Sequence, residues 1–189
     1  MLYLASKSPR RRELLSQIGL EFDLVDVWVD EQRAVGEPPD AYVVRVAREK
    51  AEAGLARLAG RQDVLVLAAD TEVIADDTVF GKPVDRDQAA AMLARLAGRD
   101  HRVLSAVWLM TEDRAECVQS RSRVWFAALS DAEIAHYVDS GEWRDKAGGY
   151  AIQGRAAALI ERLDGSYSGV MGLPLFETRR LLAAFGVRV

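Results

Sequence analysis

An unbroken apolar run from Val64 to Ala69, followed at once by Asp70 and Thr71, constrains the fold more than any other feature of the sequence. The run has the length of a strand, and its lack of alternating polar residues predicts that protein covers both faces of that strand. In α/β proteins such strands lie at the centre of the sheet and present functional residues at their C-terminal ends. We therefore expect a central strand that ends at Asp70 and holds this carboxylate at the edge of a cleft. The alternative is that Asp70 only caps a turn, as aspartates in loops often do.

Segments with helical and strand-like patterns alternate along the chain, without a repeat or a linker, and predict a single α/β domain over residues 1–189. Half of the residues are hydrophobic, which is enough for one sizeable core. Beyond the central strand, the expected elements are a helix that begins at Pro9, a long helix within residues 40–60, an alanine-rich helix over 85–97, a hairpin of two long strands over 101–110 and 117–129, a helix that starts at the capping box of Ser130 and Glu133, and a last helix over 174–185.

Three consecutive arginines, Arg10, Arg11 and Arg12, lie in the first turn of the helix that Ser8 and Pro9 are expected to start. The helix dipole disfavours cations at this end. The placement makes sense if a phosphate binds among the guanidinium groups and the free N–H groups of the first turn. The alternative is a solvated basic helix face. Because the formal net charge is −4, we expect a local anion site and no stable binding of nucleic acid.

The histidine and cysteine content limits the metals that the chain can hold. His101, His136 and the single Cys117 cannot provide a zinc site of the usual ligand spacing, so a metal would be held mainly by oxygen, as Mg²⁺ or Mn²⁺ is. One cysteine also excludes an internal disulfide, and no apolar run has the length of a signal peptide or a membrane span. We therefore expect a cytoplasmic protein that does not associate with membranes.

Four charged residues are candidates for chemistry, each with a simpler alternative. Asp70 follows the apolar run, and Glu31 ends a strand-like segment over residues 22–31 but could be solvated. Lys50 lies on the long helix, where a solvent-facing position is the simpler interpretation, and Lys82 lies in a short Gly-Lys-Pro loop that could present it to a phosphate. No nucleophile with a partner base stands out. Cations for phosphates and oxygen ligands for a hard metal favour metal-assisted hydrolysis of a polyphosphate.

An ordered set of motifs along nearly the whole chain resembles the Maf family of nucleoside triphosphate pyrophosphatases. These motifs are "LASKSPRRRELL", "VDEQR", "YVVRVAREKA", "AADT", "GKP", "DKAGGYAIQG" and "GSYSGVMGLPLFET". The resemblance implies a two-lobed mixed sheet flanked by helices with a central cleft, similar to that of the inosine triphosphate pyrophosphatases. It also implies hydrolysis of a nucleotide between the α- and β-phosphates, which releases a nucleoside monophosphate and pyrophosphate.

The family's functional positions fall on residues of this chain that match its motifs. The resemblance implies that Asp70 is the proton acceptor and that Glu31 and Asp70 are associated with Mg²⁺ or Mn²⁺. It implies phosphate binding by Ser8, Arg10, Arg11, Lys50 and Lys82. It further implies substrate selection by Arg10, Thr71 and Gln153, in the form typical of the branch that hydrolyses dTTP and UTP.

Among the departures from the family pattern, Glu72 stands where an apolar residue is usual after "ADT", and Ser105 replaces a usual threonine. They leave the base preference open, so a 7-methyl-GTP pyrophosphatase is one alternative. Another is a nucleotide-sensing or cell-division regulatory protein that uses the same cleft. A nucleoside triphosphate is the expected partner, and a homodimer is common among relatives, although the sequence does not determine the oligomeric state.

Overall fold

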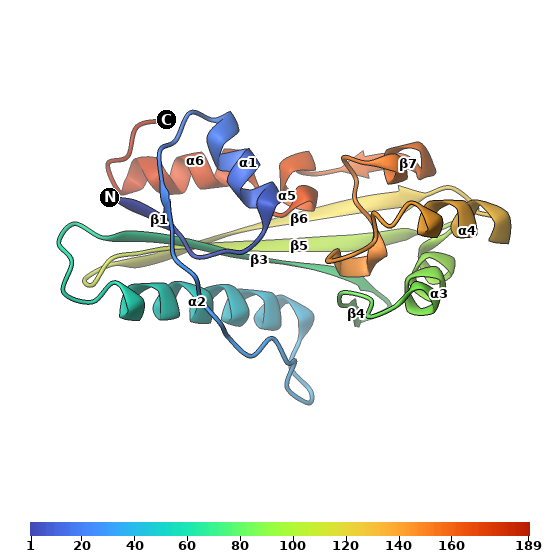
Figure 1. The fold of residues 1–189 in the computed structure, drawn as a ribbon, viewed down its shortest axis with the longest axis horizontal. Coiled ribbons are helices and arrows are strands. Elements are labelled where there is room, and N and C mark those ends of the chain that lie inside the picture. Colours follow the sequence, from blue (N-terminus) through green and yellow to red (C-terminus); the bar gives the residue numbers. More distant parts are fainter.

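The computed structural model describes residues 1–189 and has a seven-stranded mixed sheet with helices on both sides (Figure 1). The strand order is β2-β1-β3-β5-β6-β7, and β4 pairs with β3. β1 runs parallel to both β2 and β3, and the other pairs are antiparallel. The expected mixed α/β sheet is confirmed. Its strands are β1 (Leu2–Leu4), β2 (Asp23–Leu24), β3 (Leu65–Ala75), β4 (Thr78–Phe80), β5 (Asp100–Met110), β6 (Ala115–Phe126) and β7 (Ile160–Asp164).

The helices begin at the local signals that the sequence carries. Pro9 and Pro39 open α1 and α2, and Ser130 forms the expected capping box with Glu133 at the start of α4. The helices are α1 (Pro9–Gln17), α2 (Pro39–Arg57), α3 (Arg86–Leu96), α4 (Asp131–Asp139), α5 (Tyr167–Met171) and α6 (Leu175–Ala184), with 3₁₀ turns η1 (Ala147–Gly149) and η2 (Arg155–Leu159). None of them is both long and apolar enough to span a bilayer.

The central strand differs from its prediction in one respect that matters for the site. The sequence predicts an end at Asp70, and this boundary is wrong, because β3 continues to Ala75. β3 pairs with β5 in the antiparallel direction along nearly its whole length, from Val66 to Ile74. On its other edge β3 pairs with β1 only over Leu65–Leu67 and with β4 only over Val73–Ala75. The residues between, Ala68–Glu72, have no strand neighbour on that edge, so side chains from other elements can approach them there.

The strand predicted over residues 22–31 is also mostly wrong. Only Asp23 and Leu24 are in β2, because the partner strand β1 is itself short and β2 lies at the edge of the sheet. The rest of the segment continues as a loop toward α2, past the N-terminal end of that helix (Figure 1). Glu31 is therefore presented by a loop rather than by the end of a strand.

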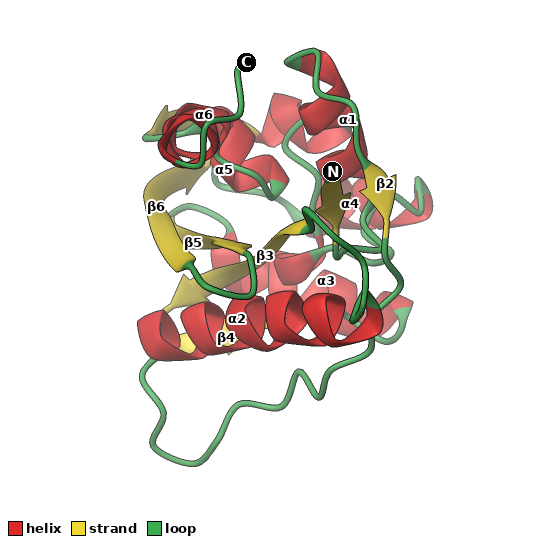
Figure 2. Cartoon of the chain, turned by 90° about the vertical axis from the view of Figure 1, so that its left-hand side faces the viewer, coloured by secondary structure: helices red, strands yellow, loops and turns green.

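Helices cover the two faces of the sheet unequally. α2 lies on one side, while α1, α5 and α6 lie on the other (Figure 2). Val66 and Ile74 of β3 pack on the α2 side, whereas Leu67 packs with side chains of α1 and α6. Because successive side chains of a strand alternate, Asp70 and Glu72 share the α2 side with Val66. We call this side the α2 face, and the side that carries Thr71 the opposite face.

Candidate active site

A group of four charged side chains meets on the α2 face, brought together from one helix, one strand and two loops of the chain. The ammonium nitrogen of Lys50, on α2, lies 2.7 Å from Oδ1 of Asp70 and 2.7 Å from Oε1 of Glu31. Lys82, in the loop after β4, lies 3.3 Å from Oε2 of Glu31. The hydroxyl of Tyr42 donates to the backbone carbonyl of Glu31 at 2.5 Å and fixes the loop against α2. The structure therefore joins the four charged residues predicted from widely separated motifs.

Lys50 does not face solvent, which was the simpler interpretation of its position on the helix. Its side chain is only 11% exposed, and that of Asp70 only 8%. A lysine this buried requires paired anions, and Glu31 and Asp70 provide them. The helical position that could have been solvent-facing is thus part of a buried charge cluster.

Burial and charge act in opposite directions on the two glutamates of the cluster. Burial would raise the pKa of Glu31, but Lys50 and Lys82 outweigh it and lower that pKa below its ordinary value. For Glu72, burial followed by the negative charges of Asp70 and Glu31 raises the pKa well above the ordinary value. Oδ2 of Asp70 and Oε2 of Glu72 are both buried without a hydrogen-bond partner. The α2 face therefore holds two buried oxygens that no protein group satisfies.

The opposite face carries a closed hydrogen-bond network around Thr71. Its hydroxyl lies 2.7 Å from that of Ser105, which donates to the carbonyl of Gly169 at 2.7 Å. Arg11 donates from Nε to the carbonyl of Gly172 at 2.8 Å, and its terminal nitrogens reach Ser6 and Thr71 at 3.3 Å each. All three nitrogens of the Arg11 guanidinium thus contact protein groups. In the sequence, Ser105 stands out only as a departure from the family pattern. The strand register places it opposite Thr71, so both side chains are on one face of the sheet.

The N-terminus of α1 leaves donors free. Ser8 is the residue before the first helical turn, as predicted, but its side chain makes no capping hydrogen bond. Arg10 donates from Nε to the carbonyl of Met171 at 3.2 Å, and burial, followed by the charge of Arg11, lowers its pKa. Free N–H groups beside partly buried arginines fit an anion.

Gln153 has no hydrogen bond to the other predicted site residues. It is exposed in the turn between η1 and η2, and its side chain makes no hydrogen bond. At the start of the same glycine-rich stretch, burial, followed by the charge of Arg10, lowers the pKa of Lys146. The predicted role of Gln153 in substrate selection stays a prediction.

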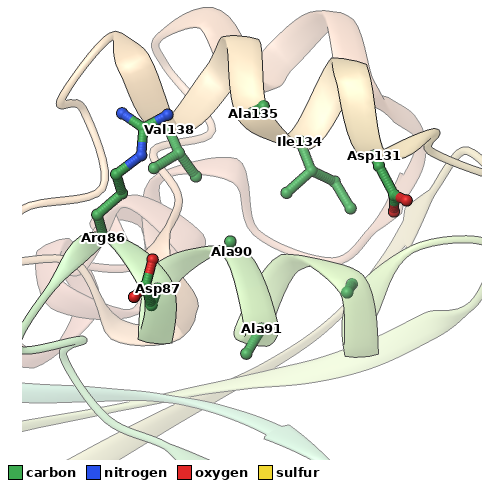
Figure 3. Close-up of a pocket in the computed structure, with 9 residues that line it drawn as sticks. Arg86, Asp87, Ala90, Ala91, Asp131, Ile134, Ala135 and Val138 are labelled. Atoms are coloured by element: carbon green, nitrogen blue, oxygen red, sulfur yellow. The ribbon is translucent and has the colours of Figure 1, made fainter.

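A separate groove of about 370 Å³ lies between α3 and α4 (Figure 3). Its walls are small and apolar, with Ala90, Ala91, Ile134 and Val138 among them, and Arg86 and other charged residues lie at its rim. None of the predicted site residues lines it. The groove is therefore separate from the charge cluster.

The residues of the cluster fit a metal that binds together with a substrate. No group of three or more His, Cys, Asp or Glu side chains is arranged to enclose an ion. The unsatisfied Oδ2 of Asp70 is nevertheless a hard donor in a buried position. Mg²⁺ is commonly bound by only one or two carboxylates, while phosphate oxygens and waters complete its coordination. The donor set matches this second kind of site.

Comparison with known proteins places the chain in a family. Residues 1–185 match the family described as Maf, Maf-like protein. The chain is 55% identical over 188 residues to the dTTP/UTP pyrophosphatase of Xanthomonas euvesicatoria pv. vesicatoria (strain 85-10), covering 98% of this chain and 99% of that protein. It is 54% identical over 186 residues to the nucleoside triphosphate pyrophosphatase of Xylella fastidiosa (strain M23), covering 98% of each. Among solved structures, the Staphylococcus aureus Ham1 protein matches with a TM-score of 0.45 and 11% identity, over 67% of this chain and 71% of that one. The chain belongs to the Maf family.

Proposed function

We propose that this protein hydrolyses nucleoside triphosphates, dTTP and UTP in preference, to the nucleoside monophosphate and pyrophosphate. The observation that carries the proposal is the environment of Asp70: one carboxylate oxygen is held by Lys50 and the other is buried without a partner. A carboxylate fixed in this way can accept a proton from a water at its free oxygen. The names of the relatives at 54% and 55% identity support the same reaction.

In this proposal the cations around Asp70 bind and orient the triphosphate. Lys50 and Lys82 each form an ion pair with Glu31 and can exchange this carboxylate for phosphate oxygens. Arg10 and the uncapped N-terminus of α1 after Ser8 supply further donors.

Asp70 takes a proton from water as the water oxygen bonds to one of the two phosphorus atoms. The bond from that phosphorus to the oxygen bridging the α- and β-phosphates breaks, and the nucleoside monophosphate and pyrophosphate are released. Mg²⁺ or Mn²⁺, held by Asp70 and Glu31, would supply positive charge that neutralises the phosphate oxygens. No covalent intermediate is required, and no nucleophile with a partner base is needed to form one.

Arg11 has a structural part in this scheme. Because its three nitrogens already contact Gly172, Ser6 and Thr71, it holds Thr71 in place and adds positive charge next to the phosphates. Thr71, together with Arg10 and Gln153, selects the base. A glutamine amide offers one donor and one acceptor, which can pair with two adjacent groups on a uracil or thymine ring.

The test is pyrophosphate release from dTTP, UTP, CTP, GTP and 7-methyl-GTP with Mg²⁺, measured as kcat/KM, and repeated with EDTA. We expect dTTP and UTP to be cleaved best, EDTA to abolish the activity, and Mg²⁺ or Mn²⁺ to restore it. A clear lead for 7-methyl-GTP would place the chain in another branch of substrate preference. Tight binding without turnover of any nucleotide would favour a nucleotide sensor, and full activity in EDTA would exclude the metal from the reaction.

A further inference from the structure

Glu72 is an acidic residue of the α2 face that the reaction proposed above does not use. It lies two residues beyond Asp70 on β3, and its side chain therefore emerges on the same face of the strand. It is only 9% exposed, and its Oε2 has no hydrogen-bond partner.

The protein provides no cation for the free oxygens of Asp70 and Glu72. The Lys50 ammonium is shared between Oδ1 of Asp70 and Oε1 of Glu31, and Lys82 binds only Glu31. Arg11 contributes positive charge nearby, but its nitrogens are hydrogen-bonded on the opposite face. A buried carboxylate oxygen without a partner is costly. Two such oxygens on the same face of one strand are a reason to look for a ligand that satisfies both.

The geometry of the sheet leaves a route for such a ligand. Asp70 and Glu72 fall within Ala68–Glu72, the stretch of β3 with no strand neighbour on one edge. Lys50 of α2 reaches this stretch at Asp70, and Arg11 of α1 reaches it at Thr71. The loop with Glu31 joins the cluster through Lys50, and the loop with Lys82 joins it through Glu31. A ligand bound to the free oxygens of Asp70 and Glu72 would therefore lie between these oxygens and a triphosphate held by Lys50 and Lys82.

We propose that Glu72 is, together with Asp70, a direct ligand of the divalent cation that accompanies the triphosphate. This inference rests on the proposed function for the identity of the substrate. Both oxygens of Glu31 are paired with lysines, so in this inference Glu72 takes the ligand position that the proposed function gives to Glu31. Two carboxylates with phosphate oxygens are a common way for proteins to hold Mg²⁺. Lys50 then stays on Oδ1 of Asp70, and because each carboxylate oxygen has two lone pairs, Oδ2 can both contact the cation and accept a proton from water.

The opposite view is that Glu72 is only a buried acid, tolerated because the strand is otherwise stable. The two views differ in the effect that they predict on metal affinity. A purely structural Glu72 has no effect on metal affinity. If Glu72 is a metal ligand, its unsatisfied oxygen destabilises the metal-free protein, and only metal binding compensates for this loss of stability.

The experiment measures Mn²⁺ binding by the loss of the electron paramagnetic resonance signal of free Mn²⁺. Wild type, Glu72→Gln and Glu52→Gln are titrated with Mn²⁺ alone and with Mn²⁺ plus α,β-methylene-UTP, an analogue that cannot be cleaved between these phosphates. Glu52→Gln is the control, because Glu52 is on α2 but pairs with Arg48 at the surface, 2.7 Å away. Thermal unfolding of the three proteins is followed with and without Mn²⁺.

We expect Glu72→Gln to weaken Mn²⁺ binding at least about tenfold in the presence of the analogue, and Glu52→Gln to leave it within about twofold. Without metal, Glu72→Gln should unfold at the wild-type temperature or above it, and Mn²⁺ should stabilise it less than the wild type. Equal Mn²⁺ affinities of wild type and Glu72→Gln would overturn the inference, as would a wild type that binds no Mn²⁺ in either titration. Absence of dTTP and UTP cleavage, with the tenfold difference in Mn²⁺ affinity intact, would count against the proposed function alone.

Discussion

The two faces of β3 differ at three consecutive residues. On the opposite face, the Thr71 hydroxyl contacts Ser105 and Arg11, and the donors of that network end on the carbonyls of Gly169 and Gly172. On the α2 face, Asp70 and Glu72 each keep a buried oxygen without a partner. A closed network fixes geometry, whereas unsatisfied groups are available to a ligand. In the function proposed above, the closed network around Thr71 therefore holds the strand in place, and the free carboxylate oxygens of the α2 face are the groups left for a metal.

This division has an energetic consequence. The network around Thr71 contributes stability at all times, because its polar groups exchange water for protein partners. The α2 face costs stability in the absence of ligand and regains it when the ligand binds. Changes on the α2 face should therefore alter activity and ligand-dependent stability, and changes on the opposite face should alter stability without ligand.

The largest effect is expected at the centre of the α2 face. Asp70→Asn keeps the shape of the side chain but removes the charge that accepts the proton, so kcat should fall between about a hundred- and ten-thousandfold. Binding of α,β-methylene-UTP in the absence of a divalent cation should largely survive. Asp76→Asn, just beyond the end of β3 and paired with Arg99 at the surface, is the control and should retain the wild-type kcat. Turnover of Asp70→Asn near that of the wild type would remove Asp70 from the mechanism.

Lys50 tests whether the α2 face is held together by one shared cation. Lys50→Met leaves Asp70 and Glu31 close together with no ammonium between them, which should lower the free energy of unfolding by between about 3 and 5 kcal/mol. The matched Lys82→Met removes an ammonium that is 57% exposed, and should cost less than about 1 kcal/mol. Urea unfolding measures both variants. Equal losses of stability would show that burial of Lys50 has no special part in the cluster.

Features that depend on residues close together in the sequence could be predicted, and features that depend on distant residues could not. Pro9 after Ser8, the capping box of Ser130 and the hairpin of β5 and β6 are determined by neighbouring residues, and the structure confirms them. The length of β3 could not be predicted, because polar residues at positions 70–72 look like the end of a strand. Only the pairing with β5, a partner distant in sequence, extends it.

The site shows the same limit. The acidic and basic residues were identifiable by type and motif, but their partners were not. The pairing of Lys50 with Glu31 and Asp70 joins a helix, a loop and a strand, and the pairing of Thr71 with Ser105 depends on strand register. The substrate-selecting role of Gln153 rests on resemblance alone, because no contact joins it to the other residues.

The opposite face also contains a titratable group, and it should make the stability of the protein depend on pH. His101 lies on β5 on the same face as Ser105, is 1% exposed, and its Nε2 lies 2.8 Å from the hydroxyl of Tyr150. Burial lowers the pKa of His101 to about 4, below the ordinary value of 6.5. Between these two pH values the unfolded chain binds a proton that the folded protein does not, so stability is fully present above pH 6.5 and is lost as the pH falls toward 4.

The loss attributable to His101 should reach up to about 3 kcal/mol, from a shift of one pKa unit being worth about 1.4 kcal/mol. His101→Gln keeps a group that can bond to Tyr150 but cannot titrate, so its free energy of unfolding should fall less between pH 6.5 and pH 4 than that of the wild type. Urea unfolding at a series of pH values measures both, with His136→Gln, exposed on α4, as the control. Parallel curves for wild type and His101→Gln would show that the opposite face contributes no pH dependence through this residue, and would place the acid sensitivity among the carboxylates of the α2 face instead.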